Sequence, residues 1–348
     1  MSATQPDAIT GPSRRMAHVG LPRPRGAISA MLLDVLRRPP GTPIAPPPRA
    51  IDPLADDDFQ LALYLCYELH YRGLAGVDDR WEWDPGLLMF RGALERDFER
   101  ALHACVPIPP VPAADGTGAA LQELVAADDG PPLSRHVETR ATVEQVRELL
   151  AQRSAYQLKE ADPHSWAIPR LTGASKAALV EIQSDEYGGG RADRIHAELF
   201  AVAMTAVGLD PTYGAYLERL PAITLATVNL MSLLGLHRRL RGAIVGHLAA
   251  FEMTSSLPNR RYANGLRRLG FGAAATDFFD EHVEADAVHE NIAAWDLAGG
   301  LATADPELTP DILWGASALL ALEARWATHL LSAWQRGETS LLEPLAAP

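Results

Sequence analysis

The chain has 348 residues, 47% hydrophobic and 22% charged, which is ordinary for a globular protein with one large or two modest cores. Its net charge of −13 argues against nucleic acid as the main partner. No run of about 18 unbroken apolar residues and no secretory signal is evident, so we expect a cytoplasmic protein without a membrane span. Cys66 and Cys105 lack a Cys-x-x-Cys spacing, so neither a disulfide framework nor a zinc ribbon is predicted.

The first 50 residues are rich in proline and arginine, with ten prolines and seven arginines. Such a composition buries little apolar surface, so we predict a mostly disordered tail over 1–50, with one or two helical turns at 28–36. In the next segment, 51–141, apolar residues recur at helical spacing over 56–71 and 85–104, and a proline-rich stretch follows. We expect N-terminal helices and a linker that pack on the main body.

The main body, 142–338, begins with Thr142-Val143-Glu144-Gln145, which fits a helix capping box. Alternation with a period of two is nearly absent from the chain, so we predict an all-α helical bundle with additional N-terminal helices. A helix should end before Pro258, and the last helix should start at Thr309 and Pro310. The predicted helices are 142–161, 174–187, 191–207, 222–255, 259–268, 276–298 and 310–336.

One short segment, 278–289, places His282, Asp286 and His289 at positions i, i+4 and i+7. On an α-helix these three side chains share one face. Two imidazoles and a carboxylate make a nitrogen and oxygen ligand set, which suits iron or manganese. The alternative is a solvated helix face, because several glutamates lie nearby.

Other helices carry the carboxylates and the histidine that could complete such a site: Glu160, Glu186, His196 and Glu252. A rigid helix would place Glu186 and His196, ten residues apart, about 80° out of register. The glycines at 188–190 tolerate conformations that break a helix, so they allow the two side chains to meet.

Two of these assignments have alternatives. Glu181 and Asp185 share the helix of Glu186 and could take its place as a ligand. Glu252 could instead be an exposed carboxylate at a helix end, although the helix dipole opposes a negative charge there.

Taken together, these residues resemble the haem-oxygenase-like di-iron oxidases and oxygenases, also called the iron-containing redox enzyme family. The resemblance is carried by Glu160, by Glu186 with His196 ten residues later, and by the His-x3-Asp-x2-His pattern that ends at His289. Glu252 is similar to an additional glutamate that some members contribute from a core helix. The resemblance covers about residues 142–335, and residues 68–73 are similar to an upstream helix of some relatives.

The resemblance implies a haem-oxygenase-like bundle that holds two ferrous ions, with manganese as an option at one position. It implies activation of O2 to oxidise a small organic substrate by N-oxygenation, desaturation or oxidative C–C cleavage, with an external electron donor. The implied metal ligands are Glu160, Glu186, His196, Glu252, His282, Asp286 and His289.

Charge balance supports all seven ligands. Two ferrous ions carry four positive charges, the four carboxylates carry four negative charges, and the three histidines are neutral, so the site has no net charge. A buried site requires such a balance. After O2 has oxidised both irons and remains bound as a dianion, the site is neutral only if Glu252 is a ligand. We therefore also assign Glu252 a catalytic role in the oxygenated state. The alternatives are a haem-binding bundle and a non-catalytic metal-binding protein, and a homodimer remains open.

Several other polar residues have structural interpretations. His247 lies in an apolar run and is interpreted as a core histidine. The cluster Arg238, Arg239 and Arg241 predicts ion pairs with the acidic body, or alternatively a clamp for a substrate carboxylate. Glu68 is interpreted as a packing or surface residue.

Overall fold

The computed structural model describes residues 19–346, except the side chains of residues 285–288. The described chain is helical, with one isolated β-bridge between Val19 and Leu74, and this confirms the predicted all-α bundle. Within the same residues, no helix is both long enough and apolar enough to cross a membrane. The α-helices are α1 (Ala27–Leu36), α2 (Asp57–Glu68), α3 (Pro85–Cys105), α4 (Thr117–Ala126), α5 (Leu133–Thr139), α6 (Val143–Gln157), α7 (Asp162–Ser165), α8 (Gly173–Glu186), α9 (His196–Ala206), α10 (Ala222–Leu236), α11 (Arg241–Arg268), α12 (Ala273–Asn291), α13 (Gly300–Ala304) and α14 (Thr309–Gln335).

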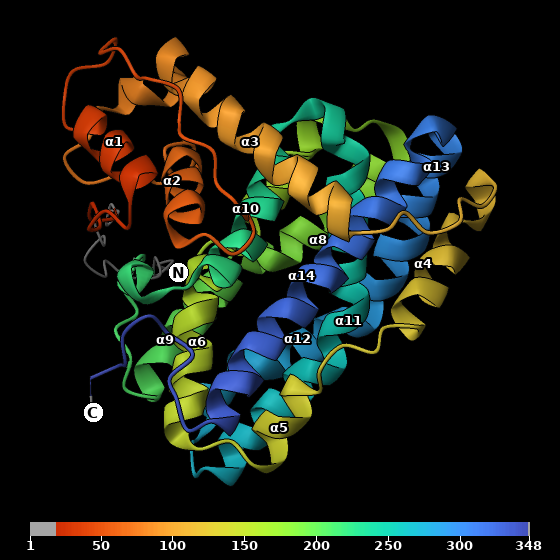
Figure 1. Cartoon of the computed structure of the whole chain (residues 1–348). Coiled ribbons are helices and arrows are strands. Elements are labelled where there is room, and N and C mark those ends of the chain that lie inside the picture. The colour runs from red at the N-terminus through yellow and green to blue at the C-terminus, as the bar shows by residue number, and fades with distance from the viewer. Residues whose placement is uncertain (1–18, 347–348) are drawn as a thin grey trace, which may run out of the picture.

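The long helices α11, α12 and α14 run alongside one another as the body of the molecule, with α1 and α2 to one side, beside α10 (Figure 1). Where α11 crosses α14, two glycines allow the backbones to touch. A Cβ atom on Gly246 would lie 1.8 Å from the carbonyl oxygen of Ile312, and one on Gly315 would lie 2.0 Å from that of Ala243. Only glycine fits such a crossing. The contact fixes the position of α11, which carries Glu252 less than two turns beyond Gly246.

The helices between residues 222 and 268 are divided differently from the prediction. α10 ends at Leu236, and His237 has an extended backbone conformation. The Arg170 guanidinium donates hydrogen bonds to the carbonyl oxygens of Gly235 and Leu236, the latter at 2.8 Å, so these groups have partners outside the helix. α11 then runs through Pro258 without a break. Proline removes one helical hydrogen bond, but α12 and α14 pack along α11 and hold it together.

The segment 19–50 is ordered, in contrast to the disordered tail predicted for 1–50. α1 buries apolar side chains that include Leu32, Leu33 and Leu36. The Asp58 carboxylate at the start of α2 accepts hydrogen bonds of 2.8 Å from the backbone N–H groups of Ile28 and Ser29, which caps α1. The composition of residues 1–50 did not predict this packing, because the apolar residues that α1 contacts lie outside that segment, in α2. Residues 1–18 lie outside the described part of the chain.

A buried ion pair ties the N-terminal helices to the bundle. Glu68, at the end of α2, is fully buried and lies 3.1 Å from the ammonium nitrogen of Lys159. The Tyr213 hydroxyl donates to the same carboxylate at 2.7 Å, and Lys159 lies 4.0 Å from the centre of the Tyr71 ring. This contact holds the turn that follows α6, in which Glu160 is the next residue. Thr142 begins α6 with the predicted capping box.

Candidate metal centre

Six of the predicted ligands lie at helix ends or on the inner faces of long helices. Glu160 is in the turn after α6, Glu186 is the last residue of α8, and His196 is the first residue of α9. Glu252 lies on α11, and α12 carries both His282 and His289. All six are at most 7% exposed. Burial at this level removes the solvated-face alternative for His282 and His289 and the exposed alternative for Glu252.

These side chains form two groups whose potential ligand atoms lie within 4.8 Å of one another. Glu186 belongs to both groups. The side chain of Asp286, the remaining predicted ligand, lies outside the described residues. The first group is Glu160, Glu186, His196 and His282, and the second group is Glu186, Glu252 and His289.

The first group converges from four segments of the chain. His282 Nε2 lies 3.4 Å from Glu160 Oε1, and His196 Nδ1 lies 2.9 Å from Glu186 Oε2. The rings of His196 and His282 are 4.3 Å apart. His282 Nδ1 donates to the backbone carbonyl of Phe278 at 2.8 Å, which leaves Nε2 directed at Glu160. Gln157, one turn before Glu160, donates to Glu160 Oε1 at 3.2 Å.

The second group is centred on His289. Its Nδ1 atom lies 3.5 Å from Glu252 Oε2, and its Nε2 atom lies 2.9 Å from Asp185 Oδ2. Asp185 is 59% exposed at its side chain and offers no ligand atom to either group. Asp185 is therefore placed to orient His289, as outer carboxylates commonly do for histidine ligands, whereas Glu186 is the carboxylate that both groups include. The sequence pointed to Asp185 only as a competitor of its neighbour.

The glycine turn brings the two halves of the first group together as predicted. Gly188, Gly189 and Gly190 have φ angles of 68°, 59° and 83°, in the left-handed region that favours glycine. A Cβ atom on Gly188 would lie 2.6 Å from the backbone carbon of Arg194. The chain therefore reverses tightly between Glu186 and His196, and both residues face the same interior.

The interior of the site contains buried polar atoms that fit a metal ion. Within the described part of the chain, four of them make no hydrogen bond of good geometry, although three of the four lie within 3.5 Å of an oppositely charged or polar neighbour: Glu160 Oε2, Glu186 Oε2, His196 Nδ1 and His289 Nδ1. An unsatisfied buried polar atom costs about 1–3 kcal/mol, so such a cluster needs a ligand. Carboxylate and imidazole donors suit iron and manganese, and these residues therefore fit the metal ions that the resemblance implies.

Burial and pairing shift the pKa values of these groups in opposite directions. Burial raises the pKa of Glu160 and of Glu252, against the attraction of the neighbouring histidines. Burial also acts to raise the pKa of Glu186, but His196 outweighs it and holds the pKa at about 2. Burial acts to lower the pKa of His289, but hydrogen bonds to Glu252 and Asp185 raise it to about 9. A cation that binds to His289 must therefore displace a proton at neutral pH.

A cavity of about 510 Å³ reaches the first group and is here called the metal-side cavity. Glu160 and His282 form part of its wall, and Phe251, Phe279 and Leu319 supply apolar surface. Arg153 also lines it, with a paired contact of 2.8 and 2.5 Å to the Glu323 carboxylate. A small organic molecule can therefore lie against two of the predicted ligands, in a largely apolar space.

Three of the other polar residues singled out in the sequence, Arg239, Arg241 and His247, have structural partners. Arg239 makes two contacts of 2.6 and 2.7 Å with Glu99, and Arg241 contacts Asp305 at 2.8 Å. These are the predicted ion pairs. His247 is buried and lies 3.1 Å from a ring nitrogen of His164, as a core histidine should.

Comparison with known proteins gives a family and a fold. A model of the iron-containing redox enzymes matches residues 147–324. Two crystal structures of a CADD-like protein of unknown function from Nostoc punctiforme have TM-scores of 0.51 and identities of 17% and 16%. Those matches cover 63% and 65% of this chain and 97% of that chain, and they show a shared fold. A domain of unknown function with a heme oxygenase-like fold from Shewanella denitrificans has a TM-score of 0.49 and 14% identity over 66% of this chain and 95% of that one. No protein of curated function matches the chain.

Proposed function

The chain belongs to the family of iron-containing redox enzymes, and we propose that it is a non-haem di-iron oxidase or oxygenase that uses O2. The family predicted from the residues is thereby confirmed. The observation that carries the di-iron proposal is the pair of buried ligand groups that share Glu186. Bound iron would supply the electrons that activate O2 for oxidation of an organic substrate.

The described residues divide between two ion positions. Glu160, His196 and His282 would hold one ion, Glu252 and His289 would hold the other, and Glu186 would serve both. Asp286 stays a predicted ligand of this centre. With Asp286 included, four carboxylates balance two ferrous ions, which favours a fully buried centre. Manganese at one position is compatible with the same donors.

The surrounding side chains would prepare the substrate and the ligands for the reaction. The metal-side cavity would hold the substrate against the first group, where its apolar wall excludes water. Gln157 holds the Glu160 carboxylate, and the Phe278 carbonyl holds the His282 ring, so both ligands are oriented before an ion binds. N-oxygenation, desaturation and C–C cleavage are all compatible with this cavity, and we expect an external electron donor.

Anaerobic loading of the full chain with Fe(II), followed by iron counting and rapid mixing with O2, tests the proposal. We expect about two irons per chain and a transient visible absorbance after mixing. Fewer than about one iron per chain, with no transient, would refute it. Glu181→Ala is the matched control, since Glu181 is exposed on the same helix as Glu186. A haem protein would instead bind haemin with an intense absorbance band near 400 nm, roughly one haem per chain.

Glu252 has a separate test, because the charge argument gives it a role in the oxygenated state. Glu252→Ala should bind iron and then lose the transient absorbance faster than the unaltered protein does. Thr205→Ala is a suitable control, since the exposed Thr205 hydroxyl donates to the Ala201 carbonyl of its own helix at 2.9 Å and lines neither group. An unchanged decay rate in Glu252→Ala would contradict the charge argument.

A further inference from the structure

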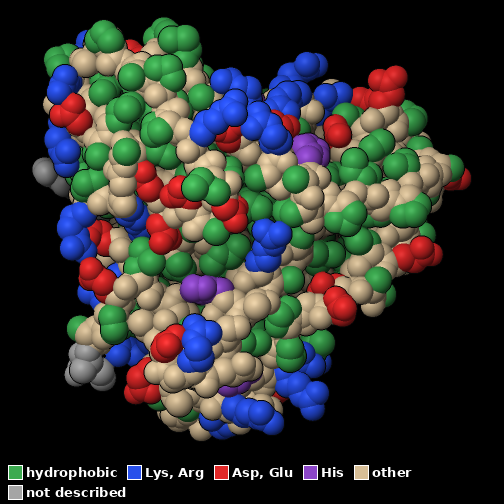
Figure 2. Space-filling model, in the orientation of Figure 1, with side chains coloured by type: hydrophobic (Ala, Val, Ile, Leu, Met, Phe, Trp, Pro, Cys, Tyr) green, Lys and Arg blue, Asp and Glu red, His purple; other side chains and the backbone are tan. Residues whose placement is uncertain are grey.

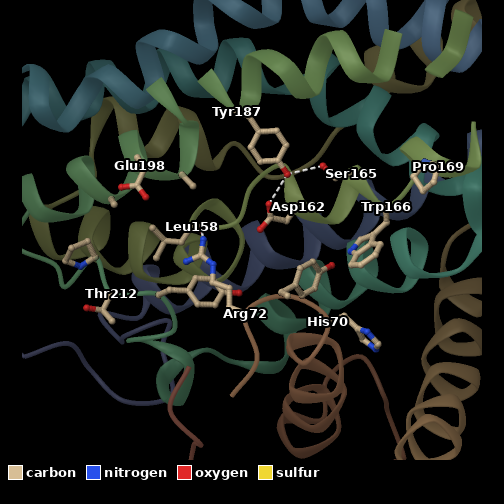
Figure 3. A pocket seen from close by; sticks show the side chains of 15 residues that line it. His70, Arg72, Leu158, Asp162, Ser165, Trp166, Pro169, Tyr187, Glu198 and Thr212 are labelled. Carbon is tan, nitrogen blue, oxygen red and sulfur yellow. Dashed lines mark hydrogen bonds between the residues drawn. The ribbon is translucent and has the colours of Figure 1, made fainter. Parts of the chain in front are cut away.

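A second cavity, larger than the metal-side cavity, lies where the N-terminal helices meet the bundle. Its volume is about 1010 Å³, and it is bounded by the turn after α2, by α7, by the residue after α8, by the start of α9 and by the loop at 211–213. Figure 3 shows Glu198 and Thr212 at one end, Trp166 and His70 at the other, and Asp162 between them. We call it the junction cavity.

The junction cavity is separate from the metal centre, although the two share segments of the chain. None of the predicted ligands with a described side chain lines it. Tyr187 and Glu198 nevertheless follow Glu186 and His196 closely in the sequence. Part of its wall comes from residues 70–72, outside the region 147–324 that matches the family. The cavity is therefore formed only when the additional N-terminal helices pack on the bundle.

Four aromatic side chains line this cavity. Tyr71, Trp166, Tyr187 and Tyr213 all line it. The Tyr187 hydroxyl donates to Asp162 Oδ1 at 2.9 Å and lies 3.0 Å from the Ser165 hydroxyl, which fixes the tyrosine ring beside the carboxylate (Figure 3). Aromatic faces beside a carboxylate are the surroundings in which proteins bind organic cations.

The charges of the lining favour a positive ligand. Within the part of the chain that the structure describes, neither Asp162 nor Glu198 forms an ion pair. The one guanidinium in the lining, that of Arg72, is engaged by the protein. Its Nη2 atom donates to the carbonyl of Leu158 at 2.7 Å, and its Cζ atom lies 4.1 Å from the centre of the Tyr213 ring. Two carboxylates therefore face one guanidinium that already has partners.

We propose that the junction cavity binds an organic cation, an ammonium group carried on an aromatic or apolar body. The rings of Trp166 and Tyr187 would contact the body, and Asp162 with Glu198 would attract the charge. Binding there would need neither metal ion nor turnover. The site goes beyond the proposed oxidase function, since it lies apart from the metal ligands.

Calorimetric titration of the full metal-free chain with three indole compounds tests this proposal. Tryptamine is cationic, tryptophol is its neutral analogue, and indole-3-acetate is anionic. We expect tryptamine to bind at least about tenfold more tightly than tryptophol, with indole-3-acetate the weakest, and added salt to reduce the preference. Equal binding of tryptamine and tryptophol, or no tryptamine binding at millimolar concentration, would overturn the proposal.

Variants assign the binding to this cavity. Asp162→Asn and Glu198→Gln should each weaken tryptamine binding by about threefold to tenfold and leave tryptophol binding unchanged. Asp128→Asn is the matched control, because Asp128 lines the metal-side cavity. Glu198 is exposed at the start of α9, so its variant tests the proposal even if Asp162→Asn fails to fold. If only Asp128→Asn lost tryptamine binding, the binding site would be the metal-side cavity, and the proposal would be refuted.

Discussion

The two ligand groups of the metal centre are supported in different ways. In the first group, a buried histidine, His282, is held by a backbone carbonyl of its own helix. In the second group, His289 is held by Asp185, a side chain that is 59% exposed. A backbone contact within one helix persists whenever the helix is folded. A contact to an exposed side chain depends on that side chain's charge and on competition from water.

This difference indicates that the first group is the more preorganised of the two. It offers four described residues with potential ligand atoms, against three in the second. Proton competition acts in both groups, because Glu186 raises the pKa of His196 against the effect of burial, as Glu252 and Asp185 do for His289. We therefore expect the first ion to bind more tightly than the second, and Glu186 to couple the two.

The largest effect should come from Glu186→Ala, because both groups lose a shared carboxylate. We expect both binding steps in an anaerobic Fe(II) titration to weaken by more than the roughly 100-fold that outer-shell changes cost at most. Glu181→Ala should bind as the unaltered protein does. If Glu186→Ala retains one step of normal affinity, Glu186 does not bridge, and the two groups are independent.

Substitution of each of the two histidines of α12 should affect iron binding by one ligand group and not by the other. His289→Ala removes a ligand of the second group only, so the iron content should fall from about two to about one per chain. His282→Ala should remove the tighter step instead. Iron counting after gel filtration, together with the titration, distinguishes these outcomes. Loss of both ions in His289→Ala would show that the first group cannot hold an ion by itself.

Asp185→Asn should have a smaller effect that is confined to the second group. The amide still accepts a hydrogen bond from His289 but no longer carries a charge, so the second step should weaken by about tenfold. The first step should be unchanged. Asp193→Asn is a matched control, because Asp193 is an exposed carboxylate paired with Arg191. Equal weakening of both steps would mean that Asp185 supports the centre as a whole.

The last expected effect is on folding stability, with no change in metal binding, and it concerns the core behind both groups. Burial lowers the pKa of His164 to about 4 and lowers that of His247 well below its usual range. The folded state therefore favours the neutral rings. Their contribution is complete above about pH 6.5 and is lost as the pH falls through about 4, by up to about 1.4 kcal/mol per pH unit for each ring.

Urea unfolding of the metal-free protein between pH 7.5 and pH 5 measures this loss. The double variant His164→Leu/His247→Leu should show a shallower decline of unfolding free energy with falling pH. His103→Gln, at an exposed histidine, should leave the decline unchanged. A decline equally steep in the double variant would assign the acid sensitivity to other groups.

Figure 2 shows positive, negative and apolar side chains intermingled over one face of the molecule. The charge of −13 is thus no guide to the chemistry inside. A few positions of the sequence did indicate that chemistry. The spacing placed His282 and His289 on one helix face, and the glycines at 188–190 indicated a break between two helices. Local rules suffice there, because helix periodicity and glycine conformations depend on adjacent residues.

What the sequence by itself determined is the helical class, the capping of α6 and the residue types of a candidate metal centre. The tertiary structure decided which carboxylate is shared, that Asp185 orients His289, that α11 continues through Pro258 and that residues 19–50 pack on the body. Each of these depends on a partner far away in the chain, such as α14 beside α11. Distances between such partners are set by packing, and periodicity along one helix carries no information about them.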